Sequence, residues 1–164
     1  MKKLNISIDG NKKTHDIIRG SGIFDQVAKN IKLAIKNNLE ITTSTTLMTF
    51  NYFQTKEIIS VVSALGVKKH YFNSFVPSGN GKIEYDLNAV EKKQVIRDSL
   101  KIRSLRNIAV ELNIPFYTRF SGNKKGPFSD FLTCTGGRTQ MTILSNGDVV
   151  GCKMLPEFVE GTIL

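Results

Sequence analysis

Segments with strand character alternate with segments of helix character along most of this chain. Runs of β-branched or alternating apolar residues predict four strands, over residues 3–9, 39–47, 67–75 and 114–117. Apolar residues spaced by three and four predict helices that begin after Ser21, near 54–65 and over about 88–112. Strands that alternate with helices pair in parallel through right-handed crossovers. The chain therefore predicts an α/β fold with helices on the outer face of a parallel sheet.

Local signals mark the ends of these segments. Ser21 is the expected N-cap of the first helix, and a short basic loop that carries Arg19 is expected before it. Asn88 and Glu91 predict a capping arrangement at the start of the last helix. A β-hairpin is expected over 140–151, with its turn at Asn146-Gly147. We place the boundary between two parts near residue 130, giving segments 1–130 and 131–164.

The composition is that of an ordinary globular protein, with 40% hydrophobic and 23% charged residues. No apolar run approaches the roughly 18 residues that a membrane span needs, so we expect no membrane contact and a cytoplasmic location. The formal net charge is +9, but the lysines are spread over many segments. This pattern favours a solvated surface, or attraction to an acidic partner, over a nucleic-acid interface.

Polar side chains gather where the first predicted strand ends, the place where α/β proteins build ligand sites. The Ser7 hydroxyl can hydrogen-bond a polar ligand. The planar fork of Arg19 suits a carboxylate. Asp9 has two interpretations that stay open: it contacts a ligand, or it orients the following loop by accepting backbone N–H bonds.

Other polar residues have a structural interpretation beside a functional one. Asn51 is expected to cap the next helix, with a ligand contact as the alternative. His15 and His70 are expected to be hydrogen-bonded structural groups. Asp130 is interpreted as a solvated loop carboxylate, with an acid–base role as the alternative. We assign no catalytic residue.

The chain contains two cysteines, Cys134 and Cys152. In a reducing cytosol they are not expected to form a structural disulfide, which leaves free thiols or metal ligands. Two thiolates alone do not complete a four-coordinate iron or zinc site.

Several motifs, taken in order, resemble those of one enzyme family. They are Ser7-Ile8-Asp9-Gly10 with His15-Asp16 and Arg19-Gly20, then 42–47 with Asn51, then Phe75-Val76-Pro77-Ser78-Gly79, and finally Cys134-Thr-Gly-Gly with Gly147 and Cys152. This order is similar to the later strands of radical S-adenosylmethionine (radical SAM) enzymes, followed by the opening of a SPASM extension. The resemblance covers nearly the whole chain.

The resemblance implies a set of cofactor contacts. S-adenosylmethionine would be contacted by Ser7, Asp9, Arg19 and Asn51, with Val76 and Pro77 flanking its adenine. Cys134 and Cys152 match ligands of an auxiliary iron–sulfur cluster in the extension. At the level of the family, the cofactors are S-adenosylmethionine and a 4Fe–4S cluster.

Two features of the family are not in this sequence, namely the C-x3-C-x2-C loop of the catalytic cluster and the glycine-glycine-glutamate segment. The resemblance thus implies the second half of a partial (β/α) barrel: a fragment or subunit that modifies a peptide or cofactor precursor and is not competent alone. A complementary N-terminal half or a second copy would be its partner. The alternative is a non-enzymatic, basic α/β module that binds nucleic acid or a protein.

Overall fold

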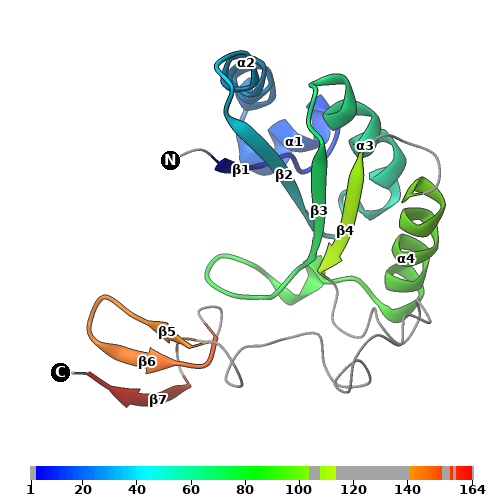
Figure 1. Cartoon of the computed structure of the whole chain (residues 1–164). Helices are drawn as coiled ribbons and strands as arrows, with labels where there is room; N and C mark the ends of the chain where they lie inside the picture. Colours follow the sequence, from blue (N-terminus) through cyan, green and yellow to red (C-terminus); the bar gives the residue numbers. More distant parts are fainter. Residues whose placement is uncertain (1–2, 104–107, 114–140, 153–155, 157, 164) are drawn as a thin grey trace, which may run out of the picture. The chain divides into compact units, whose positions relative to one another are not determined.

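The computed structural model describes residues 3–103, 108–113, 141–152, 156 and 158–163. These residues fall into two compact units (Figure 1). The first holds a four-stranded sheet with its helices, and the second holds a three-stranded sheet together with residues 76–82. The boundary expected near residue 130 lies outside the described residues, so its position stays a prediction.

The first unit alternates strands and helices in chain order. Its elements are β1 (Lys3–Ser7), α1 (Lys12–Arg19), α2 (Ile23–Lys36), β2 (Glu40–Leu47), the 3-10 turn η1 (Tyr52–Gln54), α3 (Thr55–Ala64), β3 (Lys69–Ser74), the 3-10 turn η2 (Ile83–Tyr85), α4 (Ala89–Arg103) and β4 (Ala109–Asn113).

The four strands of the first unit pair in parallel in the order β1-β2-β3-β4. Sequential strands are therefore neighbours, as in a portion of a (β/α) barrel. The register aligns Ser7 with Ser44, and Ser44 with Tyr71. The predicted α/β fold with a parallel sheet is confirmed.

The two faces of this sheet differ in polarity. One face contributes buried apolar residues such as Ile41, Leu47 and Phe72, which join the buried residues of α2, α3 and α4 in the core. The other face carries polar side chains on every strand: Asn5, Ser7, Thr42, Ser44, Thr46, Lys69, Tyr71, Asn73, Glu111 and Asn113. Parallel sheets that are packed on both faces carry apolar residues on both. The polar face of this sheet therefore differs from the apolar kind that packs against helices.

The segment expected to be a basic loop is instead the helix α1, so that prediction is wrong. The Asn11 side chain accepts a hydrogen bond from the Thr14 N–H at 3.0 Å and so caps the helix. Gly20 follows Arg19 with a φ of 117°, a conformation that favours glycine, and ends the helix. Because the buried residues of this helix are Thr14 and His15, apolar periodicity did not reveal it.

Ser21 does not cap α2, contrary to expectation. Gly22 occupies the N-cap position and has no side chain that could cap the helix. The Asp16 carboxylate of α1 accepts the N–H of Gly22 at 3.1 Å and the N–H of Phe24 at 2.8 Å instead. These hydrogen bonds lower the pKa of Asp16. A carboxylate of the preceding helix thus caps α2 and joins the two helices.

The helix predicted over 88–112 is shorter than expected. Its start is confirmed, because Glu91 accepts the Asn88 N–H at 2.8 Å and Asn88 accepts the Glu91 N–H at 3.0 Å. The described part of α4 covers Ala89–Arg103, and β4, at Ala109–Asn113, lies where the helix was predicted to continue. The strand predicted at 114–117 lies outside the described residues. Ile108 and Leu112 are four residues apart, so they fit both a helical and an alternating pattern.

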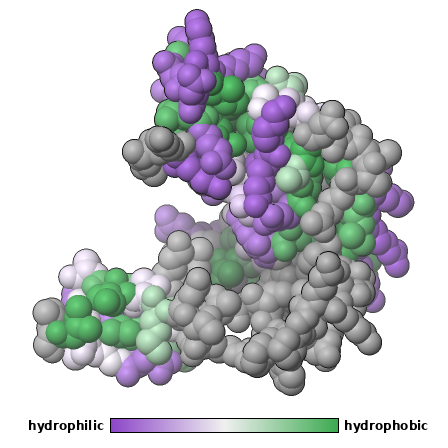
Figure 2. Space-filling view, in the orientation of Figure 1, coloured by the Kyte–Doolittle hydropathy of each residue, from purple (hydrophilic) through white to green (hydrophobic). Residues whose placement is uncertain are grey.

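The second unit contains an antiparallel sheet in the order β5 (Thr142–Ile143), β6 (Asp148–Val150) and β7 (Val159–Thr162). The β5–β6 hairpin was predicted, and the turn residue Gly147 has a φ of 89°. The third strand, β7, was not predicted. Figure 2 shows apolar side chains gathered on this small sheet. The exposed apolar residues of this part of the chain are Met141, Ile143, Phe158, Val159 and Ile163.

Candidate functional site

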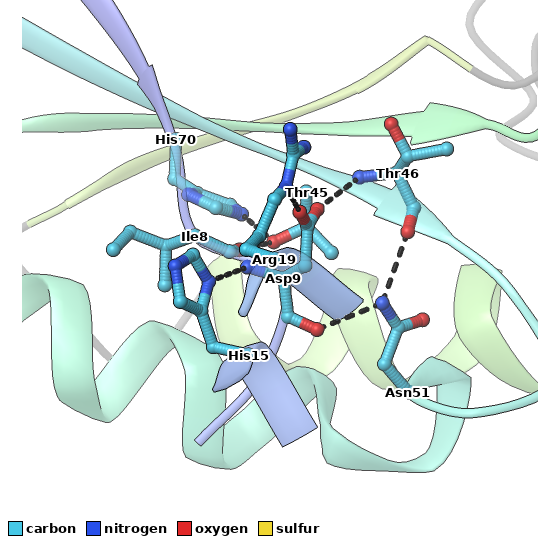
Figure 3. A network of polar contacts seen from close by, with 8 residues as sticks. All are labelled: Ile8, Asp9, His15, Arg19, Thr45, Thr46, Asn51 and His70. Atoms are coloured by element: carbon cyan, nitrogen blue, oxygen red, sulfur yellow. Dashed lines mark hydrogen bonds and ion pairs between the residues drawn. The ribbon is translucent and has the colours of Figure 1, made fainter. Parts of the chain in front are cut away.

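The carboxylate of Asp9 connects three elements just beyond the end of β1 (Figure 3). Its side chain is only 1% exposed. One oxygen, Oδ1, accepts the backbone N–H of Thr46 in β2 at 3.1 Å. The other, Oδ2, accepts the Nε–H of Arg19 at 2.6 Å. Asp9 therefore does accept a backbone N–H, but from the neighbouring strand and not from the loop that follows it.

Arg19 uses only part of its guanidinium for this ion pair. It is the last residue of α1, and its side chain is 43% exposed. The Nε–H faces Asp9, and Figure 3 shows the two terminal nitrogens pointing away from that carboxylate. Two adjacent N–H donors on a fixed guanidinium match the two oxygens of a carboxylate. The site can thus bind an anion with the fork that Asp9 holds in place.

Ser7 ends β1 on the polar face, in register with Ser44. Its side chain is half-buried, and among the described residues the structure records no hydrogen bond of its hydroxyl. The Ser44 hydroxyl beside it accepts from the Asn5 amide at 3.2 Å, and Asn5 in turn accepts from Thr42 at 3.2 Å. Hydrogen bonds therefore organise the polar face of β1 and β2 and leave the Ser7 hydroxyl for another group.

Asn51 is fully buried and does not cap the next helix, so that prediction is wrong. Its amide donates to the carbonyl of Asp9 at 2.8 Å and to the carbonyl of Thr46 at 3.0 Å. Its oxygen accepts the Met48 N–H at 2.8 Å. Both amide hydrogens are used to fix the ends of β1 and β2 against each other. Within the site, Asn51 therefore positions Asp9.

Gly10 permits a close approach between the end of β1 and α1. A Cβ at this position would lie 2.7 Å from the Cβ of Thr14 and 3.0 Å from the Gln54 oxygen. Gln54 of η1 accepts the Asn11 N–H at 3.1 Å and donates to the Thr14 hydroxyl at 2.8 Å. The Asp-Gly pair is thus explained by packing. The role of Gln54 was not predicted, because no local pattern marks it.

Both histidines are structural groups, as expected. The Nδ1 of His15 accepts the N–H of Asp9 at 3.1 Å, and burial is the largest cause that lowers the pKa of His15. His70 lies in the core between the hydroxyls of Thr43, at 2.8 Å, and Thr45, at 3.2 Å. Burial lowers the pKa of His70 to about 3. Both imidazoles are therefore neutral at neutral pH.

The remaining predicted site residues lie elsewhere in the chain. Val76 and Pro77 follow β3, are exposed and belong to the second unit. Cys152 follows β6 as a free thiol, half-buried. Cys134 and Asp130 lie outside the described residues. Within the described part of the chain, no cluster of three His, Cys, Asp or Glu residues could hold a metal ion.

Comparison with known proteins gives structural relatives only. No protein-family model matches the chain, and neither does any curated protein. Streptococcus suis SuiB bound to S-adenosylmethionine matches with a TM-score of 0.73 and 14% identity, over 97% of this chain and 39% of SuiB. SuiB bound to its precursor peptide SuiA matches with a TM-score of 0.73 and 15% identity, over 93% of this chain and 37% of SuiB.

A second relative is anSMEcpe with bound AdoMet and Cp18Cys peptide, with a TM-score of 0.68 and 18% identity. The match covers 98% of this chain and 48% of anSMEcpe. The chain therefore shares the fold of part of SuiB and of part of anSMEcpe, which are radical SAM enzymes. The predicted resemblance is thereby confirmed at the level of the fold, which is what identities this low can establish. The chain spans less than half the length of these relatives.

Among the described residues, no helix has the length and apolar character that crossing a bilayer requires.

Proposed function

We propose that this chain forms one side of the S-adenosylmethionine site in a radical SAM enzyme that modifies a peptide. Arg19 binds the carboxylate of the methionine group, and Ser7 donates a hydrogen bond to the ligand. The observation that carries the proposal is the Asp9–Arg19 pair. A buried carboxylate holds the guanidinium by Nε and leaves its terminal donors pointing away.

The position of this pair supports the proposal. Asp9, Arg19 and Ser7 all lie at the carboxyl end of β1, where α/β folds bind their ligands. Ser7 also belongs to the polar face of the sheet, where it lies in register with Ser44 of β2. Two of the relatives are named as bound to S-adenosylmethionine or AdoMet, which makes this ligand the first one to test.

A peptide is the substrate that we propose. SuiB is named with a precursor peptide and anSMEcpe with a peptide. The amides of Asn73 and Asn113 share a hydrogen bond of 2.9 Å at the same end of the sheet. Amide groups offer both a donor and an acceptor, which suits peptide bonds. A small cofactor precursor would use the same polar face.

The iron–sulfur cluster of such enzymes does not fit the residues of this chain. A C-x3-C-x2-C loop supplies three thiolates, whereas this chain contains only two cysteines. Of these two, the structure describes Cys152 alone. When bound beside a cluster, S-adenosylmethionine supplies radical chemistry in this family. The residues of this chain bind and orient that ligand.

Calorimetric titration of the chain with S-adenosylmethionine tests the proposal. Arg19→Gln is expected to weaken binding by about tenfold or more, because the carboxylate loses both donors. Arg19→Lys should give an intermediate loss, since a point charge replaces the planar fork. Arg97→Gln, which removes an exposed arginine of α4, is the matched control and should bind like wild type. Equal affinities of Arg19→Gln and Arg97→Gln would overturn the proposal, as would no binding by the wild-type chain.

A further inference from the structure

The peptide group between Ile8 and Asp9 is held from both sides (Figure 3). Its carbonyl accepts a hydrogen bond from the Thr45 hydroxyl. Its N–H donates to the Nδ1 of His15 at 3.1 Å. The side chain that follows is the buried carboxylate of Asp9, which holds Arg19. The orientation of this one peptide group therefore affects the position of the Asp9 carboxylate.

On the carbonyl side of this peptide group, the positions of the hydrogens follow from the number of hydrogens that each donor has. A threonine hydroxyl has one hydrogen, and that of Thr45 is donated to the carbonyl of Ile8. Toward His70 Nε2, at 3.2 Å, the Thr45 oxygen can therefore only accept. His70 then carries its proton on Nε2, and its Nδ1 accepts from the Thr43 hydroxyl at 2.8 Å. The donors run in one direction from Thr43 to the carbonyl of Ile8.

The second side depends on His15 in the same way. Since Nδ1 accepts the Asp9 N–H, the proton of the neutral ring must lie on Nε2. Nε2 is buried and has no hydrogen-bond partner in the described structure. The His15 ring is 1% exposed and packs edge-on against Phe24 at 5.7 Å between centroids. Within the described residues, the only hydrogen bond of the ring is therefore the one from the Asp9 N–H.

We propose that His15 is a positioning residue for the ligand site: its neutral ring holds the Asp9 peptide group, and through it the Arg19 guanidinium, in the geometry that binds an anionic ligand. This inference rests on the proposed function of Arg19. A protonated His15 has an N–H on both ring nitrogens, so Nδ1–H would face the Asp9 N–H. Two donors cannot bond, and the Asp9 peptide group would turn away from its present orientation.

The charges around His15 oppose one another. The carboxylates of Asp9 and Asp16 favour the protonated ring, and the guanidinium of Arg19 disfavours it. Phe24 from α2 is uncharged. Burial outweighs these charges and lowers the pKa below the ordinary 6.5. We therefore expect ligand affinity to fall only once the pH decreases below the lowered pKa of His15, by up to about tenfold per pH unit.

Two substitutions separate positioning from packing. In His15→Asn the side-chain oxygen takes the place of Nδ1 and accepts the Asp9 N–H, but it does not titrate. This variant should bind S-adenosylmethionine like wild type at pH 7 and lose the weakening that His15 causes between pH 7 and pH 5. The ligand carboxylate stays ionised over that range. His15→Leu fills the space without an acceptor and should bind about tenfold more weakly at every pH.

A measurement without ligand completes the test. In 15N NMR, the Arg19 Nε–H and Asp9 N–H signals of the wild type should shift with the same midpoint as the His15 ring, and His15→Asn should lack this midpoint. Arg19 signals that do not shift with the titration of His15 would overturn the inference. So would a His15→Asn variant that binds as weakly as His15→Leu. If the wild type binds no S-adenosylmethionine at any pH, the proposed function fails, and the NMR titration by itself decides the positioning role.

Discussion

At the scale of the residue, Asp9 connects more of the site than any sequence pattern indicates. Its carboxylate joins β2 to α1. Its N–H donates a hydrogen bond to His15, and its carbonyl accepts one from Asn51. Leaving a buried group without its partner usually costs more than the hydrogen bond itself contributes. Asp9 is therefore expected to affect stability as well as ligand binding.

Asp9→Asn should lower the free energy of unfolding by about 1–3 kcal/mol. The asparagine oxygen can still accept from Thr46, but its NH2 group would then face the Nε–H of Arg19, and the ion pair is lost. Urea unfolding at pH 7 measures the change. Asp25→Asn is the matched control: its ion pair with Lys12 is exposed, so a change within about 0.5 kcal/mol is expected. Equal losses in both variants would contradict a special role for Asp9.

Sequence reasoning chose Ser7, Asp9 and Arg19 because polar residues followed a predicted strand. It did not find Thr45, Thr46 or Gln54, since hydroxyl and amide side chains are common in strands and turns. Their partners lie about forty residues away in the chain, as for Thr46 with Asp9 and for Gln54 with Asn11. Asn51 was interpreted as a cap for the same reason: a local role was visible, and the distant carbonyl of Asp9 was not.

At the scale of the element, helix ends depend on a few side chains. The start of α4 was predicted because both members of its capping box, Asn88 and Glu91, lie within four residues. The cap of α2 was missed because Asp16 belongs to another helix. Caps made within one segment are therefore readable from the sequence, whereas caps supplied by a neighbouring helix depend on tertiary structure.

Asn88→Ala should lower the free energy of unfolding by about 1 kcal/mol, because the N–H groups of Val90 and Glu91 lose their acceptor. Asn88→Asp keeps an acceptor at the N-cap and should retain most of the stability. Thermal unfolding followed by circular dichroism compares the two variants with the wild type. If Asn88→Ala and Asn88→Asp behave alike, the cap does not stabilise α4.

At the scale of the whole molecule, buried neutral histidines link stability to pH. An unfolded histidine binds a proton near pH 6.5, whereas burial lowers the pKa of His70 to about 3 in the folded chain. Between these values the unfolded state holds more protons, so the free energy of unfolding decreases as the pH falls. His15 contributes in the same direction, because its pKa is also lowered.

We expect His70 to remove about 1.4 kcal/mol of stability per pH unit as the pH falls below 6.5. Urea unfolding at several pH values between 6.5 and 5 measures this slope before most carboxylates titrate. His70→Gln should be less stable at pH 7 but show a flatter dependence on pH. A slope unchanged by the substitution would mean that His70 does not remain neutral in the folded chain.

By itself, the sequence determined the alternation of strands and helices, the parallel α/β class, the capping box of α4 and the hairpin turn at Gly147. Each depends on residues close together in the chain, whose spacing follows the period of a helix or strand. Tertiary structure decided α1, the position of β4 and the hydrogen bonds of Asp9, His15 and Asn51. These depend on partners from other elements, because a buried polar group must find its donor or acceptor wherever the fold places one.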